Sequence, residues 1–186
     1  MSKNIKLYGL LKSIDRKSKN WIKEFCFDIW DLLYFNSLFI EQDWPIKWEL
    51  ERLWLLNSLK LIYISKWDLI DLISLENTWL LKKEIIKILE EWIWKDNLYK
   101  EVEFFPVNLI SETNLEIIKW YYVMHVINSF DNYDILAHNT SSLIIDYNFV
   151  RKKWRWWRIL FSEKVKNILK SCDIGFYYID IVYEVH

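Results

Sequence analysis

Two segments of the chain repeat one pattern of apolar and polar positions. The stretches "LLKKEIIKILEE" (80–91) and "LFSEKVKNILKS" (160–171) align without gaps, and their apolar residues recur at steps of three and four. Residues at those steps share one helical face, so the pattern predicts a short amphipathic helix in each segment. A strand-like apolar run follows each helix, "EVEFFPV" (101–107) in the first copy and "GFYYIDI" (175–181) in the second. We therefore expect a strand–helix–strand unit that occurs twice.

The two copies differ at the ends of their helices. In the second copy, Ser162 suits the N-cap and Gly175 can supply a left-handed stop before the strand. In the first copy, the apolar spacing continues to Trp92, where an insertion, "WIWKDNLYK" (92–100), begins. The alignment pairs four apolar positions: Leu80 with Leu160, Ile85 with Val165, Ile88 with Ile168, and Leu89 with Leu169.

Three segments between the copies are rich in β-branched and aromatic residues. They are "EIIKWYYVMHVINSF" (116–130), "SSLIIDYNFV" (141–150) and "WRWWRILF" (154–161), separated by Asn, Asp and Ser. Such runs between turn residues are typical of strands. Their succession along the chain predicts an antiparallel meander.

The part of the chain before the first copy is less regular. "PIKWELERLWLL" (45–56) and "LKLIYIS" (59–65) suggest two more strands, whereas the apolar residues of segment 20–35 fit both helix and strand periods. No Pro-, Gly- or Ser-rich linker divides the chain. We therefore expect residues 1–186 to form a single α+β domain, with a mainly antiparallel sheet, short flanking helices and a degenerate strand–helix–strand repeat.

Charge and hydropathy narrow the classes of partner. The chain has 25 basic and 26 acidic residues, and a net charge of -1 provides no overall field that would attract phosphate backbones or anionic lipid. No stretch approaches the roughly 18 to 20 apolar residues that span a bilayer. The first residues lack the hydrophobic centre of a signal peptide. These features predict a cytoplasmic protein with no membrane partner.

The residues that commonly hold metals and cofactors are few and scattered. Cys26 and Cys172 are isolated, which favours reduced thiols, and neither lies in a cluster with His125, His138 or His186. The chain has only two glycines, so it contains no GxGxxG or P-loop motif. We therefore expect neither a bound metal nor a cofactor.

The stretch "RKKWRWWR" (151–158) combines three tryptophans with five cations. As a strand running into "ILF" it carries aromatic residues on both faces, while Lys152 and Lys153 fall in the preceding turn. We interpret the stretch as part of a β-hairpin. A platform for single-stranded nucleic acid would also pair aromatics with cations, and this remains an alternative, although no other stretch shows the mix.

Residues typical of catalysis form no convincing set. His125, Ser129 and Asp131 lie close in sequence, but alternate strand positions place them on one face without the third-group orientation that a triad needs. Adjacent acids such as Glu90 and Glu91 are expected on any solvated surface. We therefore expect that the protein is not an enzyme, with a small hydrolase as the catalytic alternative.

The central strand and the two helical copies together resemble a known family. They are similar to the immunity proteins of bacterial polymorphic toxin systems, a family formerly described as a domain of unknown function. In that family a strand that begins with two tyrosines and ends with spaced aspartates lies between two copies of a helix with a closing strand. This chain matches the central strand at Tyr121, Tyr122, Asp131 and Asp134.

The resemblance covers about residues 70–182, whereas residues 1–65 match the family poorly. The chain also departs from the family pattern at His125, where the family has asparagine. In the closing strand of the second copy, Asp180 stands where the first copy has the family's proline, Pro106.

The resemblance implies a protein that binds and neutralises a cognate toxin, without catalysis or a cofactor of its own. Inhibitors use rigid aromatic anchors, and this chain contains 13 Trp and 11 Tyr. The pattern leaves the oligomeric state open. The candidate partner-binding residues lie in the insertion and in the Trp/Arg-rich hairpin: Trp92, Trp94, Tyr99, Lys153, Trp154, Arg155 and Trp157.

Overall fold

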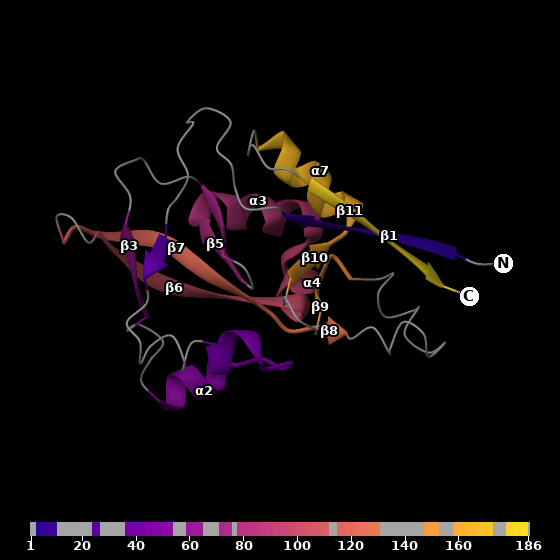
Figure 1. The fold of residues 1–186 in the computed structure, drawn as a ribbon. Helices are drawn as coiled ribbons and strands as arrows, with labels where there is room; N and C mark the ends of the chain where they lie inside the picture. Colours follow the sequence, from indigo (N-terminus) through magenta and orange to yellow (C-terminus); the bar gives the residue numbers. More distant parts are fainter. Residues whose placement is uncertain are drawn as a thin grey trace.

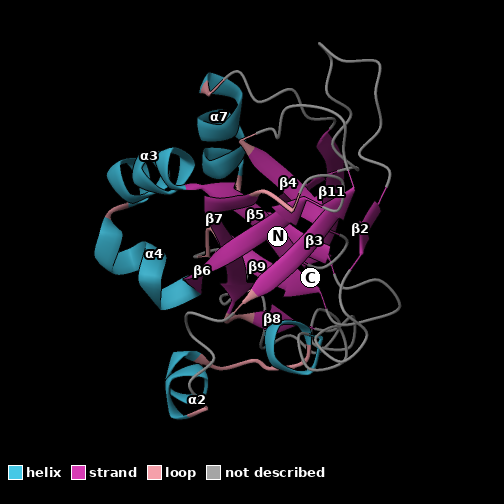
Figure 2. Cartoon of the chain, turned by 90° about the vertical axis from the view of Figure 1, so that its left-hand side faces the viewer, coloured by secondary structure: helices cyan, strands magenta, loops and turns pink. Residues whose placement is uncertain are grey.

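The protein has an α+β fold with two mainly antiparallel sheets and several short helices (Figure 1). Figure 2 shows that three of the helices, α3, α4 and α7, lie together on one side of the strands. The computed structural model describes residues 3–10, 24–26, 36–53, 59–64, 71–75, 78–111, 115–130, 147–152, 158–172 and 178–185.

The larger sheet has the strand order β2–β3–β6–β7–β5–β4 among the described residues. All neighbouring pairs are antiparallel except β3 and β6, which run parallel. The hairpin of β6 and β7 is the longest part of this sheet, and its end projects from the molecule (Figure 1). The strands are β2 (Glu24–Cys26), β3 (Lys60–Ile64), β4 (Leu72–Leu75), β5 (Thr78–Lys82), β6 (Val102–Ser111) and β7 (Ile117–Val126).

The smaller sheet has the strand order β11–β1–β10–β9–β8 among the described residues. Its first and last strands in sequence, β1 and β11, pair along their whole length, with Lys3 opposite Val185. The two ends of the chain therefore lie side by side (Figure 1). The strands are β1 (Lys3–Leu10), β8 (Ser129–Phe130), β9 (Phe149–Lys152), β10 (Arg158–Phe161) and β11 (Tyr178–Val185).

The two helices of the repeat form where the apolar spacing predicts them. α3 (Lys83–Ile93) buries Ile85, Ile86, Leu89 and Ile93, and α7 (Glu163–Ser171) buries Val165, Ile168 and Leu169. Ser162 caps α7 as predicted, because its side-chain oxygen accepts a hydrogen bond from the Val165 N–H at 3.4 Å. The insertion in the first copy forms a separate helix, α4 (Lys95–Glu101), which follows α3 directly.

The two strand–helix–strand units have the same topology. In the first unit, β5 and β6 lie on either side of β7, which is antiparallel to both. In the second, β10 and β11 lie on either side of β1, which is again antiparallel to both. An antiparallel hairpin strand precedes each unit, β4 before β5 and β9 before β10. The predicted repeat is therefore present as two split units, and the second takes its middle strand from the other end of the chain.

The strand register also agrees with the sequence alignment. In each unit the middle strand has a tyrosine that lies opposite one residue in each flanking strand. The aligned residues of the two copies occupy the same places: Leu81–Tyr122–Pro106 in the first unit and Phe161–Tyr8–Asp180 in the second. Asp180 therefore stands at the position of Pro106, as the alignment predicts.

One hydrophobic core joins the two units. The indole of Trp79 in β5 packs edge-to-face against Phe149 in β9 and Phe161 in β10, with ring centres 5.8 Å and 5.3 Å away. Edge-to-face pairs contribute about 0.5 to 1.5 kcal/mol each beyond the burial of their area. The buried faces of α3 and α7 belong to the same core.

A buried carboxylate also joins the units. Glu101, at the end of α4, accepts hydrogen bonds from the main-chain N–H groups of Asn148 and Phe149, at 2.7 Å and 2.8 Å, and from the Asn148 amide at 3.0 Å. Burial raises the pKa of Glu101, and these hydrogen bonds partly offset that effect. The start of β9 is thereby tied to the first unit.

The opposite face of the larger sheet is covered by a segment from the N-terminal part of the chain. This segment comprises a short π-helical turn, η1 (Asn36–Ile40), and helix α2 (Lys47–Arg52). Its apolar side chains and those of the sheet form a second core: Leu38, Phe39, Ile46, Leu50, Leu61, Leu80, Phe105, Val107, Leu109, Tyr121 and Val123.

Some predictions made from the sequence are wrong. Residues 47–52 form helix α2 and not a strand, because Ile46 and Leu50, four positions apart, both pack against the sheet. β8 and β9 run parallel, and β7 and β9 belong to different sheets, so the region is not a simple meander. Trp92 does not share the buried face of α3 and is exposed.

Other predictions are confirmed or lie outside the described residues. Residues 60–64 form strand β3, and Cys172 is a free, half-buried thiol whose pKa is raised by burial. The predicted hairpin is present as the antiparallel pair β9 and β10, but Lys152, predicted in the turn, is the last residue of β9 and lies opposite Arg158. The predictions for Gly175, for residues 141–146 and for the greater part of 20–35 lie outside the described residues.

The equivalence of the two units predicts that β1 can follow β11 in the chain, as β7 follows β6. We expect a circular permutant whose original ends are joined through a short Asn-Gly turn, and whose new ends lie between Leu10 and Glu24, to keep cooperative thermal unfolding by circular dichroism. A control permutant opened inside α3 should lose it. Absence of cooperative unfolding in the first permutant would contradict the equivalence.

Candidate partner-binding surface

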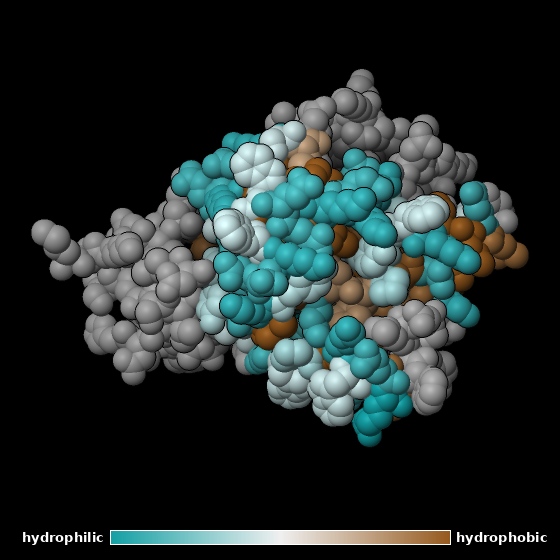
Figure 3. All heavy atoms as spheres, turned by 180° about the vertical axis from the view of Figure 1, so that it is seen from behind, coloured by the Kyte–Doolittle hydropathy of each residue, from teal (hydrophilic) through white to brown (hydrophobic). Residues whose placement is uncertain are grey.

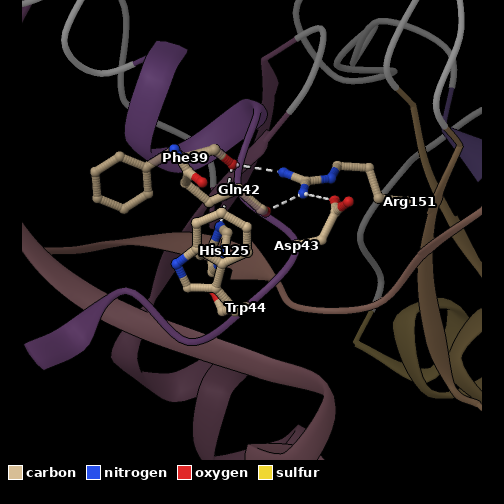
Figure 4. Close-up of polar contacts among 6 residues, drawn as sticks. All are labelled: Phe39, Gln42, Asp43, Trp44, His125 and Arg151. Atoms are coloured by element: carbon tan, nitrogen blue, oxygen red, sulfur yellow. Dashed lines mark hydrogen bonds and ion pairs between the residues drawn. The ribbon is translucent and has the colours of Figure 1, made fainter. Parts of the chain in front are cut away.

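A buried arginine holds the segment that precedes α2. The side chain of Arg151 in β9 is 1% exposed, and its guanidinium donates hydrogen bonds to the carbonyl of Phe39 at 2.8 Å and to that of Gln42 (Figure 4). It also forms an ion pair with Asp43, at 3.0 Å from Nη2 to Oδ1. Burial lowers the pKa of Arg151 to about 10. The first cation of "RKKWRWWR" is therefore a structural residue of the core.

His125 in β7 contacts the same segment from the larger sheet. Its imidazole is fully buried, with Nδ1 3.1 Å from the carbonyl oxygen of Phe39 and Nε2 3.1 Å from that of Trp44 (Figure 4). Burial, and secondarily the charge of Arg151, lowers the pKa of His125 to about 4. The ring is therefore neutral near pH 7. A neutral imidazole carries one N–H, so it donates a hydrogen bond to one of these two main-chain carbonyls.

A carboxylate completes the attachment of this segment. Glu103 in β6 lies opposite His125 and accepts hydrogen bonds from the N–H groups of Ile46 at 2.7 Å and Lys47 at 3.4 Å, at the start of α2. Burial raises the pKa of Glu103, and these two bonds lower it in part. We name Glu103, His125 and Arg151 the polar clamp, since each holds the main chain of residues 39–47.

The polar clamp includes His125, one of the three residues considered for a catalytic role. The imidazole of His125 is bonded to the main chain, Ser129 lies in β8 of the other sheet, and Asp131 lies outside the described residues. Across the parts of the chain that the structure describes, no group of three or more His, Cys, Asp or Glu side chains is placed to hold a metal ion.

The predicted insertion residues gather at one exposed corner of the molecule, where α3 ends and α4 begins. Trp92, Trp94 and Tyr99 are 58%, 76% and 40% exposed. The packing of the helices does not bury these rings. Large exposed aromatic groups are a feature of protein-binding sites. We name these three residues the aromatic corner. Figure 3 shows the molecule from the side of the helices, where pale residues lie among strongly hydrophilic ones.

Buried side chains support the aromatic corner. Ile93 and Leu98, on either side of Trp94, are buried in the core that joins the two units. The Tyr99 hydroxyl donates a hydrogen bond to Glu90 at 2.8 Å, and the Tyr99 ring packs edge-to-face on Phe104. Burial, and secondarily the bond to Glu90, raises the pKa of Tyr99. These contacts hold the backbone around Trp94 and the Tyr99 ring in place, and a preformed surface loses less entropy on binding.

Trp94 joins the two helices in an unusual backbone conformation. It is both the C-cap of α3 and the N-cap of α4, with φ of 69° and ψ of 120°. A positive φ crowds the Cβ of any residue other than glycine, at a cost of about 1 to 3 kcal/mol. The most exposed tryptophan of the corner therefore occupies a position where glycine would fold better.

Exposed apolar side chains also occur at two places that the sequence analysis did not single out. Trp44 and Trp48 are exposed at and just before α2. Leu115, Ile117 and Trp120 are exposed at the projecting end of the β6–β7 hairpin, where hydrophobic residues gather at one edge of Figure 3. Trp120 lies in the strand-like run "EIIKWYY". It comes just before Tyr121, where the described pairing of β7 with β5 ends opposite Lys82.

The second predicted group lies outside the described residues. Lys153, Trp154, Arg155 and Trp157 lie between β9 and β10, outside the described residues. The structure therefore assembles Trp92, Trp94 and Tyr99 and gives no position for the other four.

Comparison with known proteins adds no assignment. No protein-family model matches the chain, and no curated protein matches its sequence. Among the described elements, no helix has both the length and the apolar character that a membrane span requires. The fold and the surface thus define an α+β protein of two split strand–helix–strand units, one of which carries an inserted, exposed aromatic corner.

The polar clamp predicts a pH-dependent stability. The pKa of His125 is about 4 when folded and about 6.5 when unfolded, so the unfolded chain takes up the proton first as the pH falls. Between pH 7.5 and 4.5 the wild type should lose on the order of 2 to 3 kcal/mol from this residue. His125→Gln should lack this loss in urea titrations.

The comparison with His125→Gln isolates the imidazole. Glu101 and Glu103 have raised pKa values and act in the opposite direction, since the folded chain takes up their protons first, but both proteins share them. Equal loss of stability in the two proteins would show that His125 is not buried in its neutral form.

The backbone of Trp94 predicts an inverted order of two variants. Trp94→Gly should be more stable than Trp94→Ala by about 1 kcal/mol, because glycine accepts the positive φ. At Trp92, which lies within α3, the alanine variant should be the more stable one. Free energies of unfolding in urea measure both orders, and an alanine preference at Trp94 would show that its backbone is unstrained.

Proposed function

We propose that this protein is an immunity protein, which acts in the cytoplasm by binding a cognate bacterial toxin and blocking it through protein–protein contact. The proposal starts from the resemblance over about residues 70–182 and does not require catalysis by the chain. The observation that carries it is the aromatic corner, where two tryptophans and a tyrosine remain exposed on a rigid support.

The comparison between the two units supports a role for this corner. The second unit has no described counterpart of α4, because α7 ends at Ser171 and β11 begins at Tyr178. The insertion at residues 92–100, which the second unit lacks among its described residues, therefore contributes the exposed aromatic side chains. An addition of this kind suits a surface whose task is recognition.

The positions of the buried ionisable side chains also support a binding role. The polar clamp and Glu101 bond to the main chain and fix the surrounding segments. Groups used in this way give the protein a fixed surface, and a fixed surface binds a partner with less loss of conformational freedom.

The proposal predicts that the chain protects cells from a toxin encoded beside its own gene. Co-expression of the wild-type chain with the product of the neighbouring reading frame should restore growth, and the two purified proteins should form a stable complex by size-exclusion chromatography. A toxin from an unrelated system provides the control. Absence of both rescue and complex formation with every neighbouring product would contradict the proposed function.

A further inference from the structure

The chemistry of the aromatic corner identifies the kind of surface that it fits. The residues from 90 to 96, "EEWIWKD", contain three carboxylates and one ammonium group around the two exposed tryptophans. Glu91 and Asp96 are exposed, and Lys95 lies over the Tyr99 ring, with its Nζ 5.9 Å from the ring centre. Indole rings and carboxylates are therefore both exposed along residues 91–96.

The charged residues in the last turn of α3 do not stabilise the helix. The last turn of α3 contains Glu90 and Glu91 and no basic residue. The C-terminal end of a helix carries partial negative charge on its free carbonyls, so carboxylates there repel it and cations stabilise it. Glu90 and Glu91 thus add negative charge at the end of α3, while Lys95 and the N-terminal end of α4 follow directly after Trp94.

The second unit provides an internal comparison. The ungapped alignment pairs Glu90 with Lys170, and Lys170 lies in the last turn of α7, where it suits the helix dipole. Two helices of the same unit type thus end with opposite charge. The acidic end occurs beside the exposed tryptophans, and the basic end belongs to the unit without a described counterpart of α4.

We propose that the aromatic corner binds a basic segment of the partner protein, which places arginine or lysine side chains over Trp92 and Trp94 and beside Glu91 and Asp96. Indole rings attract cations through their negative faces, and tryptophan does so most strongly. An arginine can stack on an indole while its guanidinium donates hydrogen bonds to a carboxylate. This inference rests on the proposed function, because the partner is taken to be the cognate toxin.

The decisive variant separates binding from stability. Glu91→Lys places a cation in the last turn of α3, so it should leave thermal stability unchanged or raise it. The same substitution should weaken binding of the purified product of the neighbouring reading frame by tenfold or more, measured by isothermal titration calorimetry. A merely structural role for Glu91 would not move affinity and stability in opposite directions.

Matched controls keep the result specific to the aromatic corner. Glu51→Lys makes the same change of charge at an exposed site on α2 and should alter affinity by about twofold or less. Trp94→Ala should weaken binding by tenfold or more. Trp120→Ala removes a comparably exposed indole, 70% exposed, from the hairpin and should not weaken it. Higher salt should weaken wild-type binding more than Glu91→Lys binding.

The outcomes distinguish the basic-segment inference from the proposed function. If the wild type binds and Glu91→Lys binds equally well or more tightly, the basic-segment inference is overturned and the proposed function stands. If Trp120→Ala alone weakens binding, the partner docks on the hairpin instead. If the wild type binds no neighbouring product, the proposed function fails and takes this inference with it.

Discussion

The packing of Trp79 against Phe149 and Phe161 is the interaction on which the rest of the structure depends. Each split unit has only short helices, α3 and α4 in the first and α7 in the second, so it has little apolar area to bury alone. The indole of β5 inserts against two strands of the other sheet and merges both helices into one core. Glu101 fixes the same junction by bonding to the main chain of β9. The two units therefore stabilise each other, and α3 and α7 lie together on one side of the strands (Figure 2).

The polar clamp solves a second problem, the attachment of residues 39–47 to the opposite face of the larger sheet. Main-chain carbonyls and N–H groups in an irregular segment must find partners when buried. Arg151, His125 and Glu103 provide them from three different strands. Figure 4 shows the contacts of Arg151 and His125. Breaking one partner of such a buried set costs far more than the set contributes in total, so the clamp specifies one arrangement of the segment. Both faces of the larger sheet are therefore covered.

The sequence predicts the parts of this fold that depend on local periodicity. The aligned helices, the Ser162 cap and the correspondence of Pro106 with Asp180 follow from spacing alone. The helical state of residues 47–52 does not, because it depends on contacts distant in sequence. Ile46 and Leu50 pack against the sheet, and Glu103 accepts a hydrogen bond from the Ile46 N–H, 57 positions away. The exposure of Trp94 could be anticipated from the insertion, whereas that of Trp92 goes against its place in the apolar spacing of the helix. The positive φ of Trp94 and the buried state of Arg151 required the three-dimensional structure.

The central claim is that the aromatic corner is the surface that meets the partner. Hydrogen–deuterium exchange of the chain, alone and in complex with the product of the neighbouring reading frame, tests it most directly. The account predicts added protection at the end of α3 and through α4, residues 90–99, and unchanged exchange in β7 from Ile117 to Trp120. Protection that appears in the hairpin, or elsewhere, while residues 90–99 exchange as they do in the free protein would contradict the account.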